Sequence, residues 1–197
     1  MNTASPPRWA ESLLRVVLPA SAFETVAGDL LEEYRESRHP ASGARRADAW
    51  YVRQVLGFVT MSALPWGVLL GAAVVTRSAL DWFLPPPDFH ARAEVSTYFA
   101  MCVLLSVGFR AAWRSNSWLA GTVAGVATGG ISAIVSIVGA GGLLAFWHDP
   151  QTLAAIASSG GLGEVFTLPL FGLVPGLILG TIGGSAAAAG RSLHPVT

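Results

Sequence analysis

A long apolar run without a charge, residues 118–147, most narrows the folds that this chain can adopt. At a helical rise of about 1.5 Å per residue, a run of this length exceeds the hydrocarbon core of a bilayer, which is about 30 Å thick. Such a run is typical of a transmembrane helix. We expect it either to tilt in the bilayer or to break at the glycine-rich residues 139–142, where the sequence reads GAGG.

A second apolar run, residues 55–76, is bounded by Arg53 and Arg77 and contains no charge. As a helix it covers about 33 Å, which is enough to cross a bilayer. Pro65 lies within it and predicts a kink, because proline lacks the amide hydrogen and its ring clashes with the preceding turn. Neighbouring helices would then cover the carbonyl group that the proline leaves unpaired.

Two further spans are predicted at residues 93–113 and 166–190. The first of these is the weaker, because its apolar part is short and reaches full length only if Glu94 and Arg110 extend to the two interfaces. The composition agrees with four spans. Charged residues make up 12% of the chain and hydrophobic residues 52%, whereas a soluble domain carries about 25% charged residues.

The distribution of arginine predicts how the spans are oriented. With a cytoplasmic N-terminus, ten arginines lie inside and two, Arg77 and Arg92, lie outside. The ten are Arg8, Arg15, Arg35, Arg38, Arg45, Arg46, Arg53, Arg110, Arg114 and Arg191. An excess of cations on the cytoplasmic side is the usual determinant of topology. The sequence therefore predicts a multi-pass membrane protein with both termini in the cytoplasm.

Residues 1–54 have the pattern of a soluble helical module. Proline residues at 6–7 and at Pro19 predict the limits of a first helix. Ser21 followed by Glu24 predicts a capping box at the start of a second helix. The second helix carries an apolar stripe and is expected to break at residues 39–43, HPASG, and a third helix is expected to begin near Ala44 and continue into the first span. The stripe consists of Phe23, Val26, Leu30, Leu31 and Tyr34.

Together these patterns predict an all-α integral membrane protein. An N-terminal cytoplasmic helical module, residues 1–54, precedes a four-span transmembrane region, residues 55–197.

One face of the predicted second helix is acidic. Its carboxylates have helical offsets 0, 3, 4 and 7 and would repel one another; they are Asp29, Glu32, Glu33 and Glu36. Two interpretations remain open. Either the third helix folds back and pairs Arg46 and Arg53, which flank Trp50, with these acids, or part of the face stays open for a basic partner. The candidate partner-binding residues are Asp29, Glu32, Glu33, Glu36, Trp50 and Arg53.

Glycine recurs at every fourth position in the third and fourth spans. The rows are Gly121, Gly125 and Gly129, and Gly172, Gly176, Gly180 and Gly184. Small residues at this spacing let membrane helices approach closely. The rows predict either packing of the third span against the fourth, or a homo-oligomer interface or pore lining.

Several function classes are disfavoured. Formal net charge is zero, which gives no electrostatic basis for nucleic-acid binding. Cys102 is the single cysteine, and the four histidines are widely separated, so neither a metal site nor a catalytic triad is predicted. No cofactor is expected. The interiors of the spans lack ionisable residues, which argues against an ion-coupled carrier. The absence of a Ser-His-Asp or paired-carboxylate arrangement argues against an enzyme.

Three segments of the module resemble the permease prefix domain of the second type, which precedes the transmembrane core in duplicated bacterial permeases of the macrolide-exporter type. They read PPRWAESLLRVVLP, VAGDLLEEYRE and ADAWYVRQVLG. The matching positions are Pro7, Arg8, Leu14, Arg15, Leu18, Pro19, Gly28 to Glu33, Tyr34, Trp50, Tyr51, Arg53 and Gln54. The resemblance covers about residues 6–60.

This resemblance implies a cytoplasmic module used for protein contacts or regulation. Those permeases are several times longer, with a large extracytoplasmic domain and an ATPase partner, so permease activity is not carried over. We expect an accessory or regulatory component of a transport system, which docks a transport ATPase, a permease or a regulator. The alternative is a small channel or exporter subunit that oligomerises through its glycine-rich faces.

Overall fold

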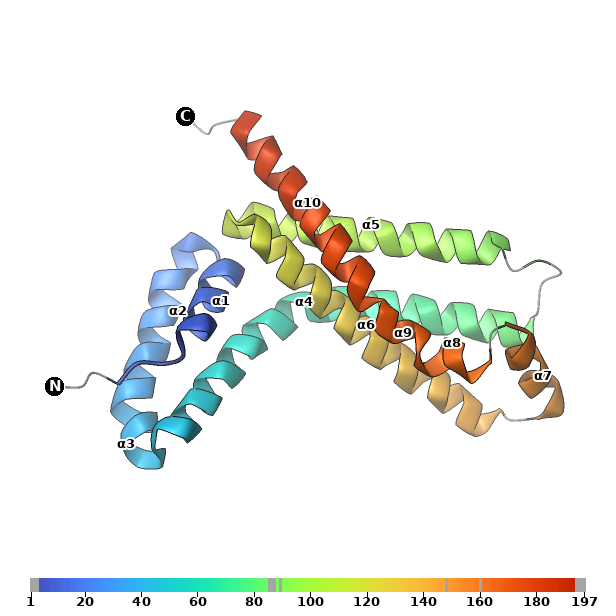
Figure 1. Cartoon of the computed structure of the whole chain (residues 1–197), viewed down its shortest axis with the longest axis horizontal. Helices are drawn as coiled ribbons and strands as arrows, with labels where there is room; N and C mark the ends of the chain where they lie inside the picture. Colours follow the sequence, from blue (N-terminus) through green and yellow to red (C-terminus); the bar gives the residue numbers. More distant parts are fainter. Residues whose placement is uncertain (1–3, 85–87, 89, 148, 160, 194–197) are drawn as a thin grey trace.

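The computed structural model describes residues 4–84, 88, 90–147, 149–159 and 161–193 of the chain (Figure 1). Within these ranges every regular element is a helix, as predicted. Four segments are long and apolar enough to cross a membrane, which confirms the predicted number of candidate spans. They are α4 (Ala44–Phe83), α5 (His90–Ser115), α6 (Trp118–Phe146) and Pro169–Leu193, the last of which contains α10 (Leu173–Leu193).

Two helices open the fold, α1 (Arg8–Val17) and α2 (Ala20–Glu33). The predicted capping box at Ser21 is wrong, because the carbonyl of Pro19 accepts hydrogen bonds from the amides of Ala22 and Phe23 at 2.9 and 3.0 Å. Ser21 therefore lies inside the first turn and forms no capping hydrogen bond.

The predicted break at residues 39–43 is confirmed, and it falls at the last of these residues. A π-helical turn, η1 (Tyr34–Arg38), and a short helix, α3 (His39–Ser42), continue the path of α2. The chain turns only at Gly43, whose φ of 77° is readily adopted by glycine. The wider π turn stands immediately before His39–Pro40, where the proline ring would otherwise clash with a regular helical turn.

The N-terminal helices and the first turns of α4 share one apolar core. Its buried members are Ala10, Leu14, Tyr34, Ala47, Tyr51 and Val55, with Phe23 and Leu30 packed against it. Three of the buried residues belong to α4. The N-terminal cluster, defined here as residues 4–55, is therefore built partly from the helix that continues into the predicted first span.

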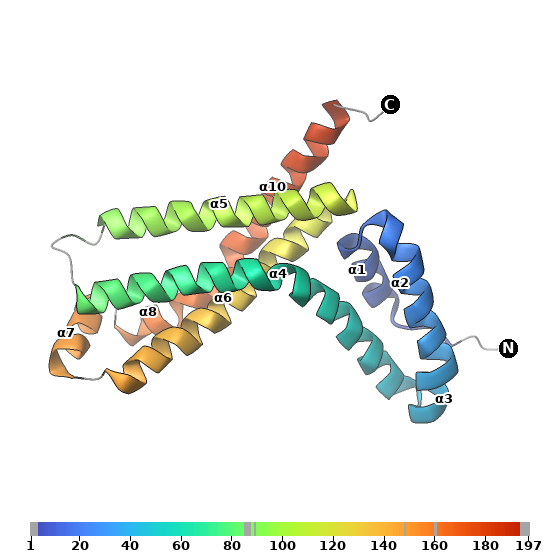
Figure 2. The same ribbon diagram turned by 180° about the vertical axis from the view of Figure 1, so that it is seen from behind.

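Helix α4 runs without interruption for 40 residues. Pro65 lies inside it, and the helix is bent along its length (Figure 2). Ser62 donates a hydrogen bond to the carbonyl of Val59 at 2.8 Å, in the turn that precedes the proline. Helix α6 also continues unbroken through Gly139–Gly142, so the alternative of a break there is excluded.

The predicted fourth span begins differently from expectation. Residues 166–190 do not form one helix, because α8 (Leu162–Phe166) and α9 (Leu168–Phe171) precede α10 as separate short turns. Prolines at 169 and 175 lack amide hydrogens, which weakens continuous helical bonding across this stretch.

The segment between the third and fourth spans contains a helix that the sequence pattern did not predict, α7 (Pro150–Ser159). Asp149 caps it, accepting bonds from the amides of Gln151 and Thr152 at 3.0 and 3.1 Å.

The start of α1 and the end of α10 lie at the same end of the molecule as the N-terminal cluster, together with the turn between α5 and α6 (Figures 1 and 2). The end of α4, the start of α5 and helix α7 lie at the opposite end. We refer to these as the cluster end and the distal end.

Candidate functional site

The acidic face of α2 and η1 is mostly open. Asp29, Glu32 and Glu36 are exposed, and no ion pair holds them within the described residues. Glu33 is half-buried and accepts two bonds from the guanidinium of Arg38, at 2.9 Å from Nε and 2.7 Å from Nη2. The cation that meets the acidic face thus comes from the same helical segment.

The pairing with α4, one of the two interpretations that the sequence leaves open, is not observed. Arg46 and Arg53 are exposed, and neither forms an ion pair with a carboxylate in the part of the chain that the structure describes. The remaining predicted site residue, Trp50, is half-buried, and the Arg38 guanidinium lies 5.0 Å from the centre of its ring. Stacking on an aromatic face stabilises a guanidinium. Glu33, Arg38 and Trp50 therefore form a fixed edge beside the three open carboxylates.

The buried Tyr34 follows Glu33 in the chain and connects this edge to the rest of the N-terminal cluster. Its hydroxyl donates to Asp48 Oδ1 at 2.7 Å and lies 3.3 Å from the carbonyl oxygen of Ser5. Burial, together with the hydrogen bond to Asp48 and its negative charge, raises the pKa of Tyr34 to about 12. The neighbouring Arg35 donates to the carbonyl of Ala4 at 3.0 Å. Three segments of the N-terminal cluster thus meet at Tyr34, which gives the acidic face a rigid support.

The two glycine rows meet inside one chain. A Cβ added at Gly180 would lie 2.5 Å from the carbonyl oxygen of Gly121, and one at Gly176 would lie 2.5 Å from that of Gly125. Likewise a Cβ at Gly129 would lie 2.7 Å from the Gly172 oxygen. The structure therefore places α6 against α10 with their backbones in contact, and both rows are covered within the protomer.

A second set of close contacts between helix backbones was not predicted from the sequence. Gly108 of α5 and Gly183 of α10 also face backbone atoms across the α5–α10 contact. A Cβ at Gly183 would approach the carbonyl of Leu105, and one at Gly108 would lie 2.5 Å from the Gly180 oxygen. These glycines lie outside the four-residue rows that signalled the α6–α10 contact.

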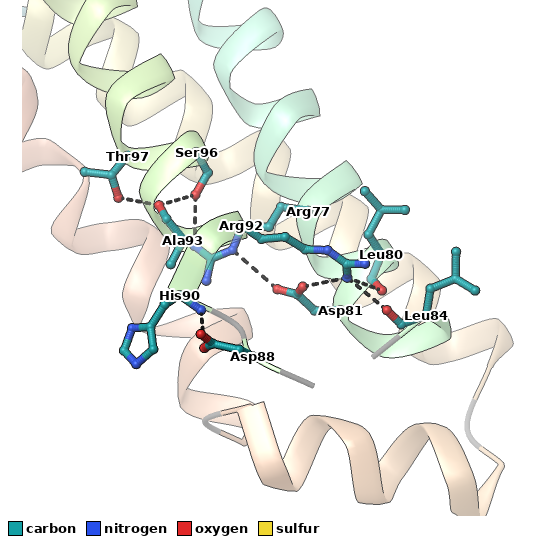
Figure 3. A network of polar contacts seen from close by, with 10 residues as sticks. All are labelled: Arg77, Leu80, Asp81, Leu84, Asp88, His90, Arg92, Ala93, Ser96 and Thr97. Atoms are coloured by element: carbon teal, nitrogen blue, oxygen red, sulfur yellow. Dashed lines mark hydrogen bonds and ion pairs between the residues drawn. The ribbon is translucent and has the colours of Figure 1, made fainter. Parts of the chain in front are cut away.

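A buried ionic network at the distal end was also not predicted (Figure 3). The Asp81 carboxylate, 5% exposed, lies 3.4 Å from Arg77 Nε and 3.1 Å from Arg92 Nη1. Arg92 also donates to the carbonyls of Leu80 and Leu84, both at 2.9 Å. The Leu80 carbonyl also accepts the backbone amide of Leu84 at 3.0 Å, and the Leu84 carbonyl lies just beyond the end of α4. Arg92 therefore both neutralises Asp81 and caps the helix. The sequence signal that could have indicated this network is the four-residue spacing of Arg77 and Asp81, which allows an ion pair on one helix face.

No group of three or more metal-ligating side chains occurs among the described residues. His39 packs against Tyr34, with ring centres 5.9 Å apart, and the His148 and His194 considered in the sequence lie outside the described residues.

Comparison with known protein families, with curated proteins and with solved structures finds no match to this chain.

Proposed function

We propose that the protein is a multi-pass inner-membrane protein of a bacterium whose cytoplasmic helical module, residues 1–54, docks a partner protein. It would act as an accessory or regulatory component of a transport system. The partner class is a transport ATPase, a permease or a regulator with a basic surface. The single observation that carries the proposal is the set of open carboxylates Asp29, Glu32 and Glu36 on a rigidly supported face.

The arrangement of the face supports docking. Carboxylates that repel one another on one helix raise the free energy of the isolated molecule by a few tenths of a kcal/mol per pair. A basic partner would offset that repulsion and would be attracted over a distance of about 8–10 Å at moderate ionic strength. Anionic lipid would repel the same face, so we expect its binding partner to be a protein rather than the bilayer surface.

The proposed orientation is supported by where the arginines lie. Arg191, at the end of α10, donates to the carbonyl of Ala112 near the end of α5, which also carries Arg110 and Arg114. These cations share the cluster end with the helical module, whereas Arg77 and Arg92 lie at the distal end. An arginine-rich end is expected to face the cytoplasm.

The alternative of a small channel or exporter subunit, formed by homo-oligomers joined through glycine faces, gains no support from the packing. Both glycine rows contact each other within one chain, so they do not offer a surface to a second copy.

Affinity purification of the tagged full-length protein from its native membrane tests the proposal. We expect a basic protein to co-purify with the wild type and to be lost from the double variant Asp29→Arg, Glu32→Arg. Glu24→Arg is the matched control, because Glu24 is an exposed carboxylate of α2 outside the acidic set. If all three preparations carry the same proteins, the acidic face is not the docking surface.

A further inference from the structure

A cavity separates the N-terminal cluster from the helical bundle. It has a volume of about 350 Å³ and is walled by the end of α1, by α4 near its bend, by the end of α5 and by the start of α6. This volume falls in the range of about 300–1,000 Å³ that is usual for small-molecule pockets. We call it the seam cavity.

The walls of the seam cavity are mostly apolar with one cation at the border. Leu18, Val59, Ala120 and Val123 contribute apolar surface, and Arg114 is the cationic residue of the lining. No acidic side chain lines the cavity, and Arg114 forms no ion pair among the described residues. An apolar chamber with a single unpaired guanidinium is complementary to an amphiphile that carries an anionic group.

The position of the cavity indicates where that amphiphile comes from. Around the cluster end, exposed tryptophans accompany arginines; Trp113 and Trp118 are 49% and 48% exposed. Tryptophan and arginine together are characteristic of the depth at which lipid headgroups lie. Basic pockets between membrane helices on the cytoplasmic side bind acidic lipid headgroups.

We infer that the seam cavity binds an acidic phospholipid of the cytoplasmic leaflet, with its phosphate on Arg114 and the start of an acyl chain between α1, α4 and α6. The lipid would then be part of the joint between the helical module and the bundle. This inference rests on the proposed membrane orientation, which a labelling experiment described below tests separately.

Native mass spectrometry of the full-length protein released from nanodiscs tests the inference. The nanodiscs hold equal amounts of phosphatidylglycerol and phosphatidylcholine. We expect the wild type to retain phosphatidylglycerol preferentially, and Arg114→Gln to reduce this retention about fivefold, the effect of one arginine near an anionic surface. Arg110→Gln is the matched control, since Arg110 is an exposed arginine one turn earlier on α5 and does not line the cavity.

A second variant addresses the apolar part of the site. Val123→Phe narrows the cavity while keeping Arg114, and we expect it to lower phosphatidylglycerol retention as well. The inference is overturned if the wild type retains both lipids equally, if Arg110→Gln loses as much lipid as Arg114→Gln, or if Val123→Phe retains lipid like the wild type. Displacement of bound lipid by inorganic phosphate alone would identify a simple anion site and also overturn it.

Discussion

At the scale of single residues, Tyr34 connects segments that are far apart in the sequence. Its hydroxyl reaches Asp48 on α4 and the carbonyl of Ser5, while its ring contacts Tyr51 edge-on, with centres 6.1 Å apart. A hydroxyl that bonds a carboxylate contributes about 1.5–3 kcal/mol when it cannot be replaced by water.

Tyr34 also makes the stability of the N-terminal cluster depend on pH. Because its pKa is raised above the ordinary value of 10.0 to about 12, the unfolded chain loses this proton at lower pH than the folded one. The contribution is therefore complete below pH 10 and declines as pH rises toward 12. We expect denaturant unfolding of the detergent-solubilised protein to show this decline, and Tyr34→Phe to be less stable at neutral pH but to lose less stability above pH 10. An equal decline in both proteins would contradict this role.

Charge pairing at the residue scale could be predicted only in part. The acidic spacing of Asp29, Glu32, Glu33 and Glu36 was visible in the sequence, and three of the four are exposed. The partner of Glu33 could not be predicted from the sequence. Arg38 reaches Glu33 only because the π turn at Tyr34–Arg38 changes the register of the helix. Arg46 and Arg53 have the right charge but lie on exposed positions of α4.

At the scale of helices, the bundle depends on the contact between the backbones of α6 and α10. Association in lipid relies on close packing rather than on the hydrophobic effect, so the absence of a side chain at each contact is the stabilising feature. A Cβ at Gly125 would lie 2.8 Å from the Cα of Gly180, and backbone atoms cannot move aside as a flexible side chain does.

Two glycine variants of α6 distinguish this contact from a general effect of glycine in helices. We expect Gly125→Ala to destabilise the bundle by about 1–3 kcal/mol, because the added methyl group forces α10 away. Gly142→Ala, in the same helix, has no atom within 4 Å of the added Cβ and should leave stability unchanged or raise it by up to about 1 kcal/mol. Unfolding in mixed micelles, followed by circular dichroism, measures both. Equal losses in the two variants would show that the contact is not specific.

At the scale of the whole molecule, the start of α1, the end of α10 and the α5–α6 turn lie at one end, and the end of α4 and the start of α5 lie at the other. The four candidate membrane helices connect these ends in alternating directions (Figures 1 and 2). The Arg77–Asp81–Arg92 network lies at the distal end, and the helical module lies at the cluster end. A membrane crossed by all four helices would therefore separate two chemically different surfaces.

Site-directed labelling tests this orientation. In a Cys102→Ser background, Ser42→Cys introduces a single thiol at a half-buried position of the cluster end, and Ser158→Cys introduces one at an exposed position of α7. We expect a membrane-impermeant maleimide added to intact cells to label Ser158→Cys alone, and both positions to react after permeabilisation. Labelling of both positions from outside would contradict the proposed orientation, whatever the result of the lipid-binding experiment.

The sequence by itself determined the helical class, the number of candidate spans and the continuity of α4 from the N-terminal cluster into the first span. These features follow from hydrophobicity and spacing along one stretch of chain, so local pattern is sufficient to predict them. Only the tertiary structure decided which glycines meet, that Arg38 rather than Arg53 binds Glu33, and that Asp81 lies buried between two arginines. Each of these depends on how helices distant in sequence approach and rotate against one another, which no single segment encodes.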